Sequence, residues 1–171
     1  MGMDVYGVAP VDEAGEYFRN NVWYWRPLWD FCCAAAPELT AGVNGHYNDG
    51  EGLNAEGAEA LALVLFDQLA SGEVAAYEKA YNERIASIPM DDCAYCNATG
   101  IRSDEVGVGM HMPDKVLGND VAIVVGRAHG WCNGCQGYGK SPSWEANYPF
   151  TEENVREFAK FLSSCGGFQI C

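Results

Sequence analysis

The sequence predicts an α+β protein that is mostly helical and forms a single domain over residues 1–171, with one small β-hairpin. Three observations lead to this class. Apolar residues recur at helical spacing in three segments, two stretches in the middle of the chain have the composition of strands, and four cysteines form two CxxC pairs. A chain of 171 residues that is 49% hydrophobic is large enough to bury one core, so no second domain is required.

The first part of the chain combines a predicted strand with a dense aromatic segment. Residues 3–6 alternate apolar and polar side chains, which is the pattern of a half-buried strand. Pro27 interrupts the aromatic segment 17–31, and proline is costly inside a helix because it lacks an N–H and its ring meets the preceding turn. We therefore expect a short helix at about 17–25 and a second helix from Pro27 to about residue 36.

Three further helices have recognisable beginnings. Asn54 precedes a periodic apolar segment and is expected to cap a helix, and a second helix follows at once over 73–87 to complete a helical hairpin. Thr151 is expected to cap the last helix, 152–164. Residues 168–171 are expected to form a terminal strand.

The predicted β-hairpin lies between the two pairs of cysteines. In residues 106–112 glycine alternates with larger side chains, and residues 121–125 are mostly β-branched. The segment 113–120, which begins with proline, would connect the two strands. Such a hairpin would bring the two pairs of cysteines close together.

The cysteine pairs are Cys93 with Cys96 and Cys132 with Cys135. Four thiolates are the complement that a closed tetrahedral zinc site requires, and they leave no position for water, so we expect one structural Zn²⁺ ion. A rubredoxin-like iron centre uses the same four ligands and stays open at this point. We expect the segment 93–140 to be a zinc-knuckle subdomain inserted between the helical hairpin and the C-terminal helix.

The glycines that follow each pair suggest a family. The second motif, CNGCQGYG at 132–139, matches the CxxCxGxG repeat completely, and the first motif, CAYCNATG at 93–100, matches it except for Ala98. These motifs resemble the cysteine-rich zinc-binding repeats of DnaJ-type proteins. That family has four repeats and two zinc ions, whereas two repeats here imply one ion. No J-domain is evident, so the resemblance implies a metal site and the binding of a peptide or protein.

The chain as a whole resembles uncharacterised bacterial and phage or prophage proteins. The resemblance rests on the start MGMDVYG at 1–7, the Tyr/Trp segment, NDG at 48–50 and GGF at 166–168. It implies a phage-associated protein but no particular activity. Paired CxxC motifs are typical of a reducing compartment, and residues 1–4 lack the basic and apolar stretches of a secretory leader. We therefore expect the protein in the cytoplasm of a bacterial host.

The charge of the chain restricts its partners. The formal net charge is −14, and residues 1–78 carry thirteen acidic and only two basic side chains. Phosphate groups would be repelled, so we do not expect direct binding of nucleic acid. No apolar stretch reaches the ~20 residues that a membrane span requires, so we expect no membrane contact. The acidity serves solubility or provides a surface that competes for a basic partner.

A candidate surface for a ligand or partner lies in the N-terminal half. Its residues are aromatic, basic or typical of polar sites: Arg19, Trp23, Trp25, Arg26, Trp29, His46 and Asp49. The tryptophans have two interpretations, since they bury large areas in a core but also stack on bases or peptides. The sequence alone leaves both open.

These observations give two hypotheses of function. The leading hypothesis is a zinc-stabilised, non-enzymatic binding protein that contacts a host protein or peptide, in one form as an acidic inhibitor of a host defence or nucleic-acid-binding protein. The alternative is a protein or enzyme that binds a small molecule or nucleotide through the tryptophan-rich half. No phosphate-binding loop, nucleophile elbow, HExxH or zinc-deaminase motif supports the alternative.

Overall fold

The computed structural model describes residues 2–171, and the contacts among these residues divide the chain into two compact units. The first unit combines residues 2–86 with 147–171, and the second is the continuous segment 87–146. Helices and small antiparallel sheets confirm the predicted α+β class.

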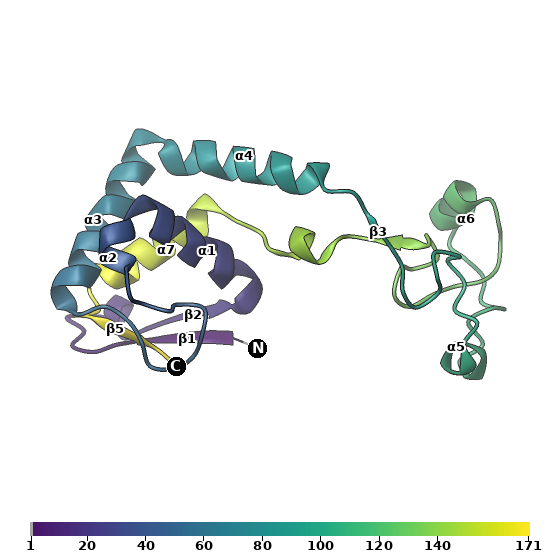
Figure 1. Ribbon diagram of the computed structural model, residues 1–171, viewed down its shortest axis with the longest axis horizontal. Helices are drawn as coiled ribbons and strands as arrows, with labels where there is room; N and C mark the ends of the chain where they lie inside the picture. Colours follow the sequence, from purple (N-terminus) through teal and green to yellow (C-terminus); the bar gives the residue numbers. More distant parts are fainter. Residues whose placement is uncertain (1) are drawn as a thin grey trace. The chain divides into compact units, whose positions relative to one another are not determined.

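Figure 1 labels the helices and strands along the chain. In chain order they are β1 (Gly2–Gly7), the 3-10 helix η1 (Glu13–Gly15), β2 (Tyr17–Asn21), α1 (Val22–Ala35), α2 (Pro37–Thr40), α3 (Ala55–Ser71), α4 (Glu73–Ser87), β3 (Asp91–Asp92), α5 (Glu105–Gly109), α6 (Asn119–Val125), β4 (Lys140–Ser141), the 3-10 helix η2 (Trp144–Asn147), α7 (Glu152–Leu162) and β5 (Phe168–Ile170).

A three-stranded antiparallel sheet, in the order β2-β1-β5, forms one layer of the first unit, and helices α1, α3 and α7 lie on one side of it (Figure 1). The expected alternation in β1 is confirmed, because Met3 and Val5 are buried. On the solvent side Tyr6 pairs with Tyr17, and their rings lie 5.0 Å apart. Both strands predicted at the chain ends are therefore present, and both belong to this sheet.

The short helix predicted at 17–25 is wrong, and the helix predicted from Pro27 to about residue 36 is present but begins earlier, at Val22. Residues 17–21 form strand β2, because they pair with β1 over its length. The Asn21 side chain then accepts hydrogen bonds from the amides of Trp23 and Tyr24 and starts α1, which continues through Pro27. A proline inside a helix costs about 3 kcal/mol. Burial of six residues of α1, Pro27 among them, offsets this cost.

The helical hairpin begins and ends as predicted. Asn54 accepts a hydrogen bond from the Gly57 amide at 2.8 Å and caps α3. Gly72 ends α3, and α4 follows immediately. Among residues 2–171 no single helix has the length and apolar composition to cross a membrane, although α3 and α4 taken together across their 78° bend would meet both criteria.

The core of the first unit is aromatic. Phe158 on α7 is fully buried, and its ring centroid lies 5.1 Å from that of Phe18 and 5.4 Å from that of Trp25. Trp25 and Trp29 stack at 5.8 Å with nearly parallel planes. Phe168 of β5 meets Trp29 edge to face, so α1, α7 and the sheet share one cluster of rings.

The predicted β-hairpin between the cysteine pairs is also wrong. The segment 106–112 contributes to the short helix α5, and 121–125 belongs to α6. Asp104 accepts a hydrogen bond from the Gly107 amide at 2.7 Å and caps α5. Helix α6 ends at Gly126, which adopts a left-handed conformation. These local caps outweigh the β-preference of the sequence, which is weak and depends on context.

Removal of the Phe158 ring should strongly destabilise the first unit. Phe158→Ala deletes a buried aromatic side chain, and we expect the free energy of unfolding to fall by about 3–5 kcal/mol. The measurement is urea unfolding followed by tryptophan fluorescence, with the exposed Lys160→Ala on the same helix as control. A loss below about 1 kcal/mol would contradict this description of the core.

Candidate metal centre

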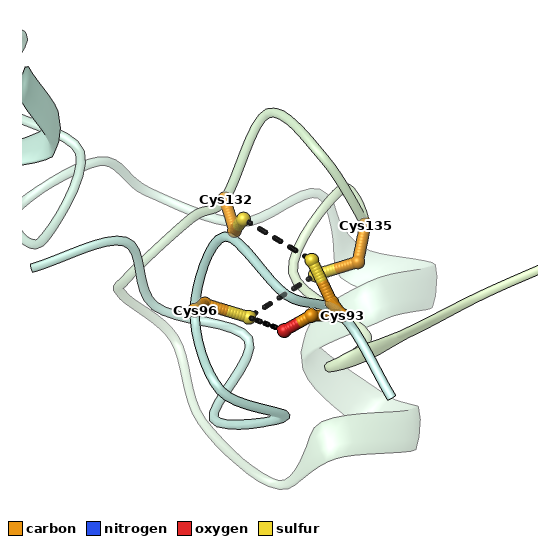
Figure 2. A group of neighbouring side chains, drawn as sticks. All are labelled: Cys93, Cys96, Cys132 and Cys135. Atoms are coloured by element: carbon orange, nitrogen blue, oxygen red, sulfur yellow. Dashed lines mark hydrogen bonds between the residues drawn. The ribbon is translucent and has the colours of Figure 1, made fainter. Parts of the chain in front are cut away.

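The sulfur atoms of Cys93, Cys96, Cys132 and Cys135 gather at one point of the second unit, as predicted (Figure 2). All four residues are buried, and the sulfur atoms lie within 4.8 Å of one another. The Cys93 and Cys132 sulfurs are 3.8 Å apart, and those of Cys96 and Cys135 are 3.7 Å apart. A tetrahedral site with Zn–S bonds of ~2.3 Å has sulfur–sulfur edges of about 3.8 Å. The four cysteines thus form a site for one structural zinc ion.

Backbone amides support the sulfurs in the same way in both motifs. We call residues 93–100 the first knuckle and residues 132–139 the second knuckle. The Gly100 amide donates to the Cys96 sulfur at 3.2 Å, and the Gly139 amide donates to the Cys135 sulfur at 3.2 Å. Amides aimed at thiolate sulfur stabilise its negative charge and orient the ligand. The glycine that ends each CxxCxGxG-like motif thus donates its amide to the sulfur of the second cysteine.

The left-handed conformations needed for these bonds recur at equivalent positions. In the first knuckle Asn97, Ala98 and Gly100 have φ of 49°, 63° and 75°. In the second knuckle the equivalent residues, Gln136, Gly137 and Gly139, have φ of 54°, 96° and 82°. The backbone of the two knuckles therefore has the same conformation at these positions. Ala98 adopts, at a steric cost, a conformation that its counterpart adopts freely as glycine.

The two knuckles are joined by backbone pairing at both ends of the site. Strand β3, just before the first knuckle, pairs with β4, just after the second. The Cys93 amide donates to the Gly139 carbonyl at 2.9 Å. On the other side the Arg102 amide donates to the Trp131 carbonyl at 3.0 Å. This backbone pairing brings the two pairs of cysteines together, as the predicted hairpin was expected to do.

The pKa values of the thiols in this cluster are shifted in different directions. Burial raises the pKa of Cys96 to about 12 and also raises the pKa of Cys132. For Cys93 burial acts in the same direction, but hydrogen bonds from the Tyr95 amide and the neighbouring thiols outweigh it and lower the pKa. Zinc binds thiolates, so the two thiols with a raised pKa, Cys96 and Cys132, must lose their protons when zinc binds. Acid therefore weakens zinc binding.

The remaining four cysteines lie outside this cluster and carry free thiols. Cys32 and Cys165 are buried, Cys33 is half-buried and Cys171 is exposed. Burial raises the pKa of both Cys32 and Cys165, so these thiols stay protonated and unreactive. Cys32 thus acts as a small buried hydrophobic residue.

The chain matches no known protein-family model, no curated protein and no solved structure. The similarity to DnaJ-type repeats therefore rests on the two knuckles themselves, and the phage or prophage origin stays a prediction. The geometry of the four cysteines is independent of either resemblance.

Two members of the predicted N-terminal surface belong to the core instead. Trp25 and Trp29 are 0% and 1% exposed, so no ligand can reach their rings. The Trp25 indole donates to the Gly45 carbonyl at 2.6 Å, which satisfies its one polar group. Of the two interpretations left open for the tryptophans, burial in the core is correct at these two positions.

The other five predicted residues are dispersed over the first unit. Arg19 lies on the outer face of the sheet, 3.8 Å from Asp4. Trp23 and Arg26 both contact Tyr148, with the Trp23 ring centroid 4.9 Å from that of Tyr148. The list is completed by His46, whose Nε2 is 3.1 Å from Asp30, and by Asp49, which accepts the Glu51 amide at 3.2 Å. Apart from Trp23 and Arg26, which share Tyr148, each of these residues contacts a different neighbour.

Two residues that support the metal centre had no signal in the sequence. Arg127 donates from Nη2 to the Gly137 carbonyl at 2.7 Å, which attaches the end of α6 to the second knuckle. Arg102 lies between the knuckles and donates to Asp104 and, at 2.9 Å, to the Asn133 side chain. A charged residue near a CxxC motif has many structural explanations, so only the fold reveals these contacts.

Loss of one ligand should abolish metal binding. We expect Cys132→Ala to contain no stoichiometric zinc and to lose the fold of the second unit, because metal binding supplies folding free energy there. Elemental analysis for zinc and iron, together with NMR spectra, measures both effects. Cys171→Ala, which removes an exposed thiol outside the site, should retain one ion. A metal-free wild-type protein with a folded second unit would contradict the assignment.

Relief of the strained alanine should stabilise the second unit. Ala98→Gly places glycine at φ 63°, where a Cβ is unfavourable, and we expect a gain of about 1 kcal/mol. Thermal unfolding of the zinc-loaded protein at several chelator concentrations measures this gain. Ala94→Gly, in the same knuckle but without a positive φ, should be neutral or destabilising. Equal effects of both substitutions would show that the backbone of Ala98 carries no strain.

Proposed function

We propose that this protein is a zinc-stabilised, non-enzymatic binding protein that contacts another protein or a peptide. The observation that carries the proposal is the exposure of large apolar side chains on the second unit. They are Met90, Tyr95, Val106, Val108, Met110, Val116, Ile123, Val124, Tyr138 and Trp144. Exposed apolar groups that gather on one part of a protein are typical of interaction sites.

The balance between buried and exposed residues strengthens this argument. Besides the four cysteines, the buried hydrophobic side chains in residues 87–146 are only Met112 and Leu117. The unit therefore exposes more large apolar side chains than it buries. Because the zinc site maintains its fold, this segment has no need to bury its apolar residues in a core of its own.

The closed coordination of the metal supports a binding role rather than catalysis at the ion. Catalytic zinc sites use three protein ligands and keep a position for water or substrate. Four buried thiolates complete the coordination without any such position. The ion therefore has a structural role: it stabilises the fold that carries the exposed apolar side chains.

The chemistry of the chain also bears on the kind of partner. With a formal net charge of −14 the protein attracts basic partners and repels nucleic acid. We accordingly propose a phage- or prophage-associated protein of the bacterial cytoplasm that contacts a host protein. A basic target, such as a nucleic-acid-binding or defence protein held by an acidic inhibitor, fits the charge.

Capture experiments test this function. We expect the immobilised zinc-loaded protein to retain a specific protein from a bacterial host lysate at about 50 mM salt and less of it at about 500 mM. Cys132→Ala, which lacks the ion, should capture none, and Cys171→Ala should behave as wild type. Native mass spectrometry of the purified protein is the complementary test. A stoichiometric small molecule, with no zinc-dependent protein capture, would favour the alternative function.

A further inference from the structure

Arg127 carries a positive charge that no carboxylate of residues 2–171 cancels. The residue is half-buried, and its Nε atom is fully buried without a hydrogen-bond partner in the described part of the chain. Its Nη2 donates to the carbonyl of Gly137 at 2.7 Å, but this carbonyl is uncharged. Burial of an unpaired charge is costly, so an anionic group close by must compensate it.

The other three basic side chains of the second unit are already engaged. They are Arg102, which pairs with Asp104 at 2.9 Å, Lys140, which pairs with Asp92 at 3.3 Å, and Lys115, which lies 3.7 Å from the centre of the Trp131 ring. A carboxylate or an aromatic face offsets each of these charges. In the second unit, residues 87–146, the charge of Arg127 is therefore the one left for another anionic group.

The fold places the Arg127 guanidinium against both knuckles. A Cβ added at Gly100 would clash with the Arg127 Nη2 and with the Gly137 carbonyl oxygen, so the guanidinium lies directly on the Gly100 backbone. The Gly100 amide donates to the Cys96 sulfur at 3.2 Å. Standard bond lengths across Gly100 then place Nη2 within about 8 Å of that sulfur. This distance is below the Debye length of ~10 Å at 0.1 M salt, so the two groups interact electrostatically.

Helix α6 holds Arg127 in this place. The helix buries none of its own residues and ends at Gly126, whose left-handed conformation turns the chain immediately before Arg127. On the other side, the amide of Leu117 donates to the Ala128 carbonyl at 2.9 Å. The residues before and after Arg127 are thus both fixed, and so is the position of its charge.

We propose that Arg127 is the counter-charge of the metal centre and a positioning residue for its ligands. Four thiolates around one divalent zinc ion leave two negative charges uncompensated. Zinc uptake displaces protons from thiols, so the loaded site is more negative than the metal-free site. The guanidinium stabilises the loaded site, and its bond to Gly137 aligns the second knuckle with the first. This role of Arg127 is independent of the proposed binding function.

Substitutions of Arg127 separate its charge from its hydrogen bond. Arg127→Gln keeps an amide donor but removes the charge, and Arg127→Lys keeps the charge. In competition with a chromophoric chelator, we expect Arg127→Gln to weaken zinc binding at least about tenfold and Arg127→Lys to weaken it less than about threefold. Lys140→Gln removes an equal charge that Asp92 already pairs, and it should change the affinity less than about twofold.

Cobalt in place of zinc gives a readout that a purely structural role would not change. The thiolate-to-cobalt charge-transfer absorption should move to longer wavelength in Arg127→Gln, because loss of the positive charge raises the energy of the sulfur electrons. The d–d absorption of tetrahedral cobalt should keep its shape, which shows that the four ligands are still in place.

Two results would overturn the proposal. One is wild-type zinc affinity in Arg127→Gln. The other is an equal loss of affinity in Arg127→Gln and Arg127→Lys without a shift of the charge-transfer absorption. If Arg127→Gln takes up no metal at all, Arg127→Lys decides, because normal loading of the lysine variant supports the proposal and equal failure overturns it.

Discussion

Coordination of one ion by thiolates from two distant segments is the constraint on which the second unit depends. Residues 87–146 bury only Met112 and Leu117 as large hydrophobic side chains besides their cysteines. So small a core supplies little of the free energy needed to order about 60 residues. The metal site replaces the missing core, and the paired backbones of the two knuckles give it a fixed shape. In this part of the chain, stability therefore does not depend on burying the apolar side chains that lie at the surface.

The first unit, by contrast, is stabilised by a hydrophobic core. Its largest buried rings, Trp25, Trp29 and Phe158, lie in one cluster between α1, α7 and the sheet. The aromatic residues that suggested a binding surface in the sequence therefore account for the fold of this unit. Large apolar side chains are exposed on both units, and on α5 and α6 they lie in the part of the chain whose core is smallest.

The limits of sequence-based prediction can be traced to particular residues. The metal ligands and the helices capped by Asn54 and Thr151 were predictable, because spacing and cap chemistry are local signals. Strand β2 was not, since its pairing with β1 depends on a partner distant in the chain and Asn21 moves the helix start. Helices α5 and α6 were mistaken for strands, because β-branched composition concealed the cap at Asp104. The exposure of Ile123 then followed no recognisable pattern.

Closure of the chain through the ion has a consequence for how the chain tolerates insertions. Residues 97–131 form a loop whose two ends are fixed at Cys96 and Cys132. The entropy of closing such a loop changes slowly with its length, so insertions at its exposed positions cost little stability, whereas Met112 and Leu117 within it are buried. The exposed turns of the segment between the knuckles can thus be lengthened while the metal centre keeps its geometry.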